Sequence, residues 1–489
     1  MLHHTPVLPE IAAKYEAVIG LEVHAQLKTN SKLFCGDSIA FGAEPNTHVS
    51  AITLGHPGTL PKTNEKAVEM AIKLGLACNC TIEKDNYFAR KNYFYPDLPK
   101  GYQISQHTTP ICKGGFITIH TATGSKDVLL NRIHMEEDAG KSIHDIDPFV
   151  SCIDLNRAGT ALVEIVTEPC LHTAEEAYLY VTELRRLVQW IDVCDGNMEE
   201  GSLRCDANIS VRLKGETALG TKVEVKNLNS IRNIKKAIEF EIDRMIGVIE
   251  NGGKIIQQTR SFDAEKDTTF AIRDKEEAND YRYFADPDLA PFHLTNEFIE
   301  GIRANLPALP QQLINDFQIQ YQLSPYDAAT LCLTKDSADY FLAVANYTNN
   351  YKAIANWLLG PIKQYLNDAG IGFQQLSLLP QTLANLITII DEGKVNFSVA
   401  STKMLPSLIL HNSHPLQLAE DLNLLQVSDS NELEKWILEA IEAMPDKVQE
   451  YKKGKKGLIG LFVGEVKKRS KGKADPKLVT QLLQEKLSS

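Results

Sequence analysis

Hydrophobic and polar residues alternate strictly in several short stretches of the first half of the chain. In residues 19–26 the apolar positions 21, 23 and 25 separate the polar side chains of Glu22, His24 and Gln26. This period of two is typical of a half-buried β-strand, and it places Glu22 and His24 on the same face. A carboxylate and an imidazole so placed can ligate one divalent ion. Because a solvated sheet face is the commoner explanation of such a pair, the metal interpretation depends on further residues.

Two later stretches alternate in the same way and carry a heavily charged face. Residues 203–212 and 222–226 each have one apolar face, and their other faces carry these side chains: Arg204, Asp206, Asn208, Ser210, Arg212, Lys222, Glu224 and Lys226. Such faces are either solvated or form the floor of a polar cleft. Their mixed charges favour a floor that binds a nucleotide together with its metal.

Helical patterns interrupt these strands. Thr173 and Glu176 form a capping-box signal before a helix over 178–191. Apolar residues at helical spacing predict a second helix over 231–249. Helices packed on a mainly antiparallel sheet define an α+β domain.

The composition changes near residue 291, after which strand signals become rare. Prolines break the following chain into helical segments. We therefore expect three domains: an α+β domain over 1–294, an all-α helical domain over 295–411, and a small α-helical tail domain over 412–489.

The composition is that of a soluble globular protein. Among 489 residues, 43% are hydrophobic and 23% are charged, and no apolar run approaches the length of a membrane span. Because the N-terminus lacks a secretory signal pattern, we expect a cytoplasmic protein with no membrane partner. The nine cysteines include no Cys-x-x-Cys pair, which favours reduced thiols over a disulfide framework.

The charge of the chain is unevenly distributed. The net charge is -12, which argues against a protein that coats nucleic acid over its whole surface. Residues 447–477, however, contain eleven Lys or Arg against three acids, a net charge of +8. Nucleic-acid binding is therefore expected at the C-terminus.

Two acidic stretches supply partners for the Glu22 and His24 pair. Glu136 and Glu137 are adjacent after a strand-like stretch, and Glu164 interrupts an otherwise apolar strand. A lone carboxylate among branched apolar residues is costly unless it is paired, protonated or bound to a metal. One of the two adjacent glutamates and Glu164 would complete a set of three carboxylates and one histidine. Mostly oxygen ligands favour Mg²⁺ over zinc, and Mg²⁺ normally accompanies nucleotide phosphates.

Residues 87–106 interleave aromatic residues, cations and prolines, which predicts a loop. Its cations Arg90, Lys91 and Lys100 could grip phosphates while an aromatic ring stacks on a base. An aromatic loop packed over the edge of the core explains the same composition equally well.

Six long motifs follow one another from residue 19 towards the C-terminus. They are Ile-Gly-Leu-Glu-Val-His (19–24), Phe-Gly-Ala-Glu-Pro-Asn-Thr (41–47), Arg-Lys-Asn-Tyr-Phe-Tyr-Pro-Asp (90–97), His-Met-Glu-Glu-Asp-Ala-Gly-Lys-Ser (134–142), Met-Glu-Glu-Gly-Ser-Leu-Arg-Cys-Asp-Ala-Asn-Ile-Ser (198–210) and Lys-Asn-Leu-Asn-Ser (226–230). In this order they resemble the motifs of the GatB family, which forms the B subunit of the tRNA-dependent amidotransferase. By this resemblance the first domain is a cradle similar to glutamine synthetase.

The resemblance implies an ATP-dependent ligase that acts on misacylated Glu-tRNA(Gln), Asp-tRNA(Asn) or both. ATP would phosphorylate the side-chain carboxylate, and ammonia would then displace the phosphate to give the amide. The resemblance also implies a heterotrimer with two further components. One is an amidase subunit that supplies ammonia from glutamine, and the other is a small subunit that holds the amidase and this chain together. The basic tail would contact the aminoacyl-tRNA.

The resemblance also assigns site residues. It implies that Glu22, His24, Glu137 and Glu164 are the catalytic residues and the Mg²⁺ ligands. Contacts to ATP and the acceptor end would come from Lys91, Lys100, Arg204, Lys226, Asn227 and Asn229. Regular alternation, however, places Glu137 on the apolar face of its strand, so either that face forms a cleft wall or a β-bulge re-aims the side chain. The choice between Glu136 and Glu137 is therefore open.

The chain departs from the family pattern in the first loop region. Many members carry four cysteines of a zinc knuckle there, at positions where this chain has Cys35, Asp37, Ser50 and Thr53. Because one thiol of four remains, we expect no structural zinc.

Two other functions are compatible with these residues. One is an ATP- and Mg²⁺-dependent kinase or ligase that acts on a small free carboxylate. The other is a non-enzymatic, tRNA-binding scaffold that uses only the basic C-terminus. A small-molecule ligase would consume ATP without tRNA, whereas a scaffold would bind tRNA equally well after neutralisation of the acidic residues.

Overall fold

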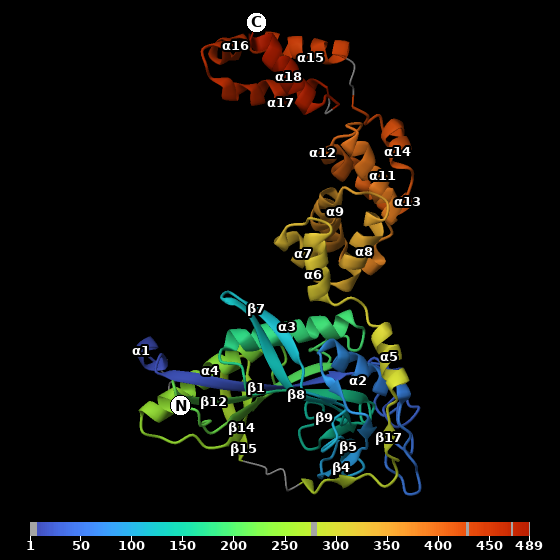
Figure 1. Cartoon of the computed structure of the whole chain (residues 1–489), viewed down its shortest axis with the longest axis vertical. Coiled ribbons are helices and arrows are strands. Elements are labelled where there is room, and N and C mark those ends of the chain that lie inside the picture. Colours follow the sequence, from blue (N-terminus) through green and yellow to red (C-terminus); the bar gives the residue numbers. More distant parts are fainter. Residues whose placement is uncertain (1–6, 275–280, 427–429, 471–472, 489) are drawn as a thin grey trace. The chain divides into compact units, whose positions relative to one another are not determined.

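The chain forms two compact units, which divide between Leu309 and Pro310 (Figure 1). The computed structural model describes residues 7–274, 281–426, 430–470 and 473–488. The strands of the described residues lie in the first unit, and the described part of the second unit is helical.

A 13-stranded sheet is the framework of the first unit. Its described strands pair antiparallel except β13 and β14, which are parallel. The main path runs through β15 (Thr268–Asp274), β14 (Gln258–Asp263), β13 (Val223–Lys226), β12 (Leu203–Leu213), β1 (Tyr15–Gln26), β11 (Ala161–Thr167), β8 (Gly124–Glu137), β5 (Tyr102–Ser105), β4 (Ala89–Asn92) and β16 (Phe284–Ala285). The strand β1 therefore lies in the interior of the sheet.

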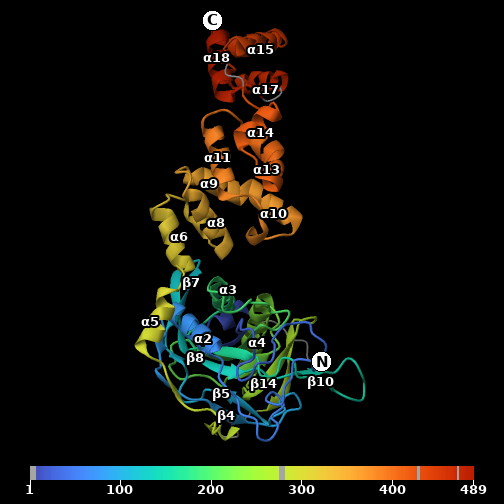
Figure 2. The ribbon, with the colours of Figure 1, turned by 90° about the vertical axis from the view of Figure 1, so that its right-hand side faces the viewer.

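One face of this sheet is apolar and is covered by helices (Figures 1 and 2). In β1 the side chains of Ile19, Leu21 and Val23 are buried on that face. The covering helices are α2 (Glu65–Ala77), α3 (Ala174–Trp190) and α4 (Ile231–Glu250). Helix α4 packs against β12, α3 against α4 and β7 (Phe116–Thr121), and α2 against β8. The polar residues of the alternating strands are thereby left on the opposite face.

Polar side chains determine where α3 and α4 begin. Thr173 Oγ1 accepts from the backbone N–H of Glu176 at 3.1 Å, and Ser230 Oγ accepts from that of Asn233 at 3.1 Å. Each bond satisfies one N–H of the first helical turn. The Glu176 carboxylate accepts from the backbone N–H of His172 at 2.7 Å, one residue before the cap. Both predicted helices are confirmed.

Shorter elements complete the first unit. They are α1 (Pro9–Ala12), α5 (Asn296–Ala304), β2 (Thr81–Ile82), β6 (Cys112–Lys113) and β7 (Phe116–Thr121) beside β8, the pair β9 (Lys141–Ile143) and β10 (Cys152–Asp154), and the pair β3 (Asp85–Asn86) and β17 (Phe292–His293). The indole N–H of Trp190 donates to the carbonyl of Ala308 at 2.9 Å. This bond ties the end of the unit back to α3.

The second unit is built from short helices, several of which begin with a proline. They are α6 (Pro310–Ile319), α7 (Pro325–Leu331), α8 (Lys335–Ala345), α9 (Tyr351–Trp357), α10 (Lys363–Ala369), α11 (Pro380–Asp391), α12 (Phe397–Val399), α13 (Leu405–His411), α14 (Pro415–Asp421), α15 (Ser430–Glu442), α16 (Pro445–Lys452), α17 (Ile459–Arg469) and α18 (Pro476–Ser488). Proline suits the first turn of a helix because the N–H it lacks would have no intrahelical partner there. Pro361 instead lies inside a π-helical turn, Leu358–Ile362.

The last four helices enclose a core of their own. Leu433, Ile437, Phe462, Val466 and Leu483 are buried together in it. No helix of the described residues is long and apolar enough to cross a membrane.

The predicted mixture of a large, mainly antiparallel sheet and a helical C-terminal region is confirmed. The boundaries at residues 294 and 411 and the likeness to glutamine synthetase stay predictions.

Candidate metal centre

Backbone register places two imidazoles and two carboxylates on the polar face of the sheet. His24 of β1 lies opposite Glu164 of β11, and Glu164 lies opposite His134 of β8. Glu136 shares this face with His134 because side chains alternate along a strand. The register therefore brings His24 together with residues that lie more than 100 positions later in the sequence.

Three of these side chains converge and form what we call the ligand cluster: His24, Glu136 and Glu164. His24 Nε2 lies 3.7 Å from Glu136 Oε1 and 3.5 Å from Glu164 Oε2. One ligand atom from each residue lies within 4.8 Å of the other two, an arrangement found once among the described residues. Two carboxylate oxygens and one imidazole nitrogen so close together fit a single divalent cation.

His134 flanks the ligand cluster. Its Nε2 lies 3.3 Å from Glu164 Oε2 and 3.6 Å from Glu136 Oε2. Burial lowers the pKa of His134, but the carboxylates of Glu164 and Glu136 outweigh it and raise that pKa to about 9. Nε2 therefore carries a proton that points towards the two carboxylates. His134 is placed to orient both carboxylates, as residues around metal ligands commonly do.

The carboxylates of the ligand cluster are held in their ionised form. Burial raises the pKa of Glu164, but the imidazoles of His134 and His24 outweigh it and bring that pKa well below its usual range. Burial likewise raises the pKa of Glu136, and the hydrogen bond from His134 brings it below its usual value. Two buried carboxylates that stay ionised in this way form a suitable environment for a cation.

Glu22 lies on the same face of β1 as His24 but outside the group of three. Its Oε1 accepts from the side-chain amide of Asn208 at 2.9 Å. Burial, then the negative charges of Glu164 and Glu224, raise the pKa of Glu22. Glu22 is thus close enough to the ligand cluster for the charge of Glu164 to affect its pKa. The role of Glu22 as a ligand stays a prediction.

Glu137 lies on the other face of β8, as regular alternation predicts. The register with β11 is unbroken from Ile133 to Glu137, so no bulge re-aims the side chain there. Its two carboxylate oxygens accept from Lys100 Nζ at 2.5 and 2.6 Å, and Oε1 also accepts from the backbone N–H of Ile104 at 2.9 Å. The predicted residues Glu137 and Lys100 therefore contact each other, whereas Glu136 joins His24 and Glu164. The assignment of Glu137 as a ligand stays a prediction.

The predicted cations Arg204 and Lys226 lie beside the ligand cluster on the polar face and are paired with acids. Arg204 Nη2 donates to Asp138 Oδ1 at 2.9 Å. Lys226 Nζ donates to Asp206 Oδ2 at 2.6 Å and lies 2.9 Å from Glu224 Oε1. Burial opposes the charge of Lys226, but Asp206 and Glu224 outweigh it and raise its pKa. Both cations remain partly exposed, so an anionic ligand can reach them.

The predicted residues Asn227 and Asn229 follow β13 in an exposed loop. Asn227 has a φ of 65°, in the left-handed region that asparagine tolerates better than most residues. Its side-chain amide donates to the carbonyl of Phe262 at 3.3 Å. This bond stabilises the turn that ends β13.

The cations of residues 87–106 have different partners. Arg90 donates to Asp286 at 2.7 Å and to Asp288 at 2.8 Å. Lys100 pairs with Glu137, as described above. Lys91 Nζ instead lies 4.8 Å from the ring centroid of Tyr281, and it has no carboxylate partner among the described residues. Part of this predicted loop forms the strands β4 and β5.

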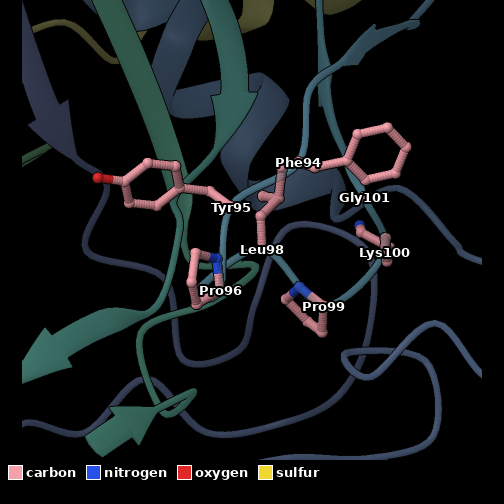
Figure 3. Close-up of a pocket in the computed structure, with 7 residues that line it drawn as sticks. All are labelled: Phe94, Tyr95, Pro96, Leu98, Pro99, Lys100 and Gly101. Carbon is pink, nitrogen blue, oxygen red and sulfur yellow. The ribbon is translucent and has the colours of Figure 1, made fainter. Parts of the chain in front are cut away.

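A pocket of about 480 Å³ opens beside Lys100 (Figure 3). Its lining comes from one short segment and consists of Phe94, Tyr95, Pro96, Leu98, Pro99, Lys100 and Gly101. Gly101 has a φ of 72°, and a Cβ there would lie 3.1 Å from the Phe94 ring, so both backbone conformation and space favour glycine.

Hydrogen bonds link the four residues that stand at the positions of the family's zinc knuckle. Asp37 Oδ2 accepts from Thr53 Oγ1 at 2.6 Å and from the backbone N–H of Ser50 at 2.8 Å. Cys35 Sγ lies 3.4 Å from Thr53 Oγ1. The two loop segments are thereby joined through side chains of this chain.

Sequence reasoning did not assign a role to His134, Asp138 or Asp206. The signal for His134 was present, because His134 and Glu136 alternate with Ile133 and Met135. The contacts of the two aspartates depend on the pairing of distant strands, which local periodicity does not contain.

The fold and the site define a class: an α+β protein with a candidate divalent-metal centre on the polar floor of a large antiparallel sheet. Residues 17–300 match the sequence model described as the GatB/GatE catalytic domain, and residues 339–487 match the one described as the GatB domain. The chain belongs to the GatB family.

Relatives named as the B subunit of aspartyl/glutamyl-tRNA(Asn/Gln) amidotransferase match nearly the whole chain. The relative from Geotalea daltonii is 48% identical over 477 residues, which cover 97% of this chain and 99% of the relative. Those from Persephonella marina and Nitratidesulfovibrio vulgaris are 47% and 46% identical over 475 residues, 97% of this chain and all of each relative. The similarity therefore includes both compact units.

Proposed function

We propose that this chain is the B subunit of a tRNA-dependent amidotransferase, which converts Glu-tRNA(Gln), Asp-tRNA(Asn) or both into the amide form. The observation that carries this proposal is the ligand cluster on a charged sheet floor, within the part of the chain that matches the catalytic domain. The names of the relatives supply the substrate class.

The reaction needs two steps because a free carboxylate is a poor electrophile. An oxygen of the substrate carboxylate attacks the γ-phosphorus of ATP, so that a mixed anhydride forms and ADP leaves. Ammonia then attacks the carbonyl carbon, inorganic phosphate leaves, and the amide is formed. Phosphorylation thus replaces an oxide leaving group with phosphate.

His24, Glu136 and Glu164 would hold Mg²⁺, since their ligand atoms fit one cation. When bound, Mg²⁺ would neutralise charge on the triphosphate. Arg204 and Lys226 would exchange part of their contact with Asp138 and Asp206 for phosphate oxygens. Glu137 would hold Lys100 in place rather than bind the metal.

The partners follow from the same proposal. An amidase subunit would supply ammonia from glutamine, and a small third subunit would join the amidase to this chain in a heterotrimer. The tRNA would be bound in part by the basic residues between 447 and 477. The protein would act in the cytoplasm. Its tasks would be divided among three domains: a cradle domain over 1–294, a helical domain over 295–411 and a tail domain over 412–489.

Reconstitution of the chain with the amidase and small subunits tests the proposal. With glutamine, Mg²⁺ and ATP, the complex is expected to convert Glu-tRNA(Gln) or Asp-tRNA(Asn) into the amidated tRNA, with release of ADP and phosphate. ATP consumption with free glutamate or aspartate and no tRNA would instead indicate a small-molecule ligase. Binding of tRNA without any ATP turnover would indicate a scaffold.

A further inference from the structure

A group of aromatic side chains lies beside the ligand cluster and has no part in the proposed reaction so far. We call Tyr93, His107, Tyr281 and Tyr283 the aromatic wall. The rings of His107 and Tyr283 are stacked, with centroids 4.0 Å apart and planes 8° apart. Tyr281 lies 6.1 Å from Tyr283 and 6.0 Å from Tyr93, edge to face in both cases.

Strand register shows that Lys91 reaches the same face of the sheet as the ligand cluster. Lys91 lies opposite Gln103 in β5, and Ser105, two residues further along β5, lies opposite Glu136. Side chains at these positions share one face because the period of a strand is two. Arg90 lies on the other face, where Asp286 and Asp288 neutralise it. Lys91 is therefore the cation of this segment that is available at the site.

Charge effects also indicate that the aromatic wall lies close to the cluster. Burial, followed by the carboxylates of Glu136 and Glu164, raises the pKa of Tyr283 to about 12. Burial, followed by the positive charges of Arg132 and His134, lowers the pKa of His107.

The aromatic wall is accessible. His107 is exposed, and Tyr281 and Tyr283 are half-buried. Within the described residues, neither the His107 ring nor the Tyr283 hydroxyl makes a hydrogen bond, so both polar groups are available to a ligand. A stacked pair with free polar edges resembles a base-binding surface more than a packed core.

The backbone between the two tyrosines is strained and is held in place by a specific contact. Arg282 has a φ of 43°, which L-residues with long side chains seldom adopt. The side-chain amide of Asn92 donates to the carbonyl of Arg282 at 2.9 Å and to that of Tyr281 at 3.3 Å. A strained backbone that is held by specific contacts in this way is found mainly at ligand-binding and active sites.

We propose that the aromatic wall is a stacking subsite for the adenine ring of an adenosine nucleotide that reacts at the ligand cluster, with Lys91 beside its anionic groups. The subsite rests on the proposed function, which brings two such adenosines to the site. One is that of ATP, and the other is the 3′-terminal adenosine that carries the amino acid. Stacking of a base on an aromatic side chain changes binding by roughly 5- to 150-fold.

The test compares Tyr283→Leu with Tyr283→Phe in the complex with the amidase and small subunits. KM and kcat are measured separately for ATP and for aminoacyl-tRNA. The Tyr283→Leu variant is expected to raise one of the two KM values about 10-fold, and the KM that rises identifies which adenosine is bound. Tyr283→Phe, which keeps the ring, is expected to stay within about 3-fold of the wild type in both.

A matched control lies one residue away in the sequence. Phe284 is 49% exposed and points to the opposite face of β16, so Phe284→Leu should leave both KM values unchanged. If Tyr283→Leu does not assemble, His107→Ala removes the exposed partner of the stack. Unchanged KM values for both substrates in the assembled variant would overturn the subsite.

Failure of the subsite is distinguishable from failure of the proposed function. If the wild-type complex forms no amide, calorimetry still compares the binding of ATP and of a short RNA ending in adenosine to the wild-type and Tyr283→Leu complexes. Weaker binding of either ligand to the variant supports the subsite, whatever the reaction. Equal binding of both ligands overturns it.

Discussion

Glu136 and Glu137 are neighbours in β8, yet their carboxylates lie on opposite faces of the sheet. Glu136 approaches His24 Nε2 at 3.7 Å, whereas Glu137 accepts from Lys100 Nζ at 2.5 Å. Two adjacent acids of the sequence therefore have different partners in the fold: Glu136 belongs to the candidate metal centre, and Glu137 neutralises a half-buried lysine.

This division predicts different effects of two matched substitutions. Glu136→Gln should weaken Mg²⁺ or Mn²⁺ binding by at least about 10-fold, because it removes an anionic oxygen from the ligand cluster. Glu137→Gln should leave metal affinity within about 3-fold but lower the apparent Tm by roughly 5 °C or more, because it leaves Lys100 without its counter-ion. Calorimetric titration and thermal unfolding measure the two effects. A reversed pattern would assign the ligand role to Glu137.

Gly55 supports the position of Lys100. Gly55 has a φ of 66°, and a Cβ there would lie 2.6 Å from Lys100 Cγ. Gly55→Ala should destabilise the protein by more than the roughly 1 kcal/mol that the backbone conformation alone costs, because Lys100 must also move. Gly58→Ala is the matched control, since Gly58 has a φ of 85° but open space around it. Equal changes in Tm for the two variants would contradict the contact.

The buried thiols should react slowly. Burial raises the pKa of Cys80 to about 12, and burial, against a hydrogen bond from the Gly196 N–H, raises that of Cys194 to about 12. The half-buried Cys35, Cys152 and Cys170 are accessible. With iodoacetamide at pH 8, mass spectrometry should find these three alkylated first, because the thiolate is the reactive form. Early alkylation of Cys80 or Cys194 would contradict the packing around them.

The tail contains both paired and unpaired cations. Lys447 and Lys455 pair with Glu450, whereas Lys452 and Lys453 are exposed and have no acidic partner among the described residues. Replacing Lys452 and Lys453 with Ala should raise the KM for aminoacyl-tRNA several-fold and reduce the salt dependence of binding.

The control replaces Lys447 and Lys455 with Ala. This double variant should raise the KM for aminoacyl-tRNA less, since Glu450 already neutralises both lysines. Glutaminase activity of the complex without tRNA should be unchanged in both. If the two double variants had the same KM for aminoacyl-tRNA, this result would argue against tRNA binding by the unpaired lysines.

Local sequence patterns predicted those parts of the fold that depend on neighbours in the chain. Alternation in residues 19–26 and 203–212 predicted two long strands, and Thr173 marked the start of a helix; the structure contains all three. These features are set by the periods of side-chain direction and by the first N–H groups of a helix.

The composition of the ligand cluster depended on strand pairing. Which glutamate joins His24 is decided by the register of β8 against β11, and the contact of Lys100 with Glu137 depends on the pairing of β5, which follows Lys100, with β8. Such contacts join residues far apart in the sequence, and a shift of one residue would exchange the two faces. Alternation alone did favour Glu136, whereas the resemblance favoured Glu137.

The most direct test of the central claim is the rate of ATP-dependent amide formation on Glu-tRNA(Gln) or Asp-tRNA(Asn) by the complex that contains His24→Ala. We predict that this rate falls about 100-fold or more, because the cluster loses its only nitrogen ligand. Glutaminase activity without tRNA should be unchanged. Amide formation at the wild-type rate by the His24→Ala complex would contradict a metal centre at this site.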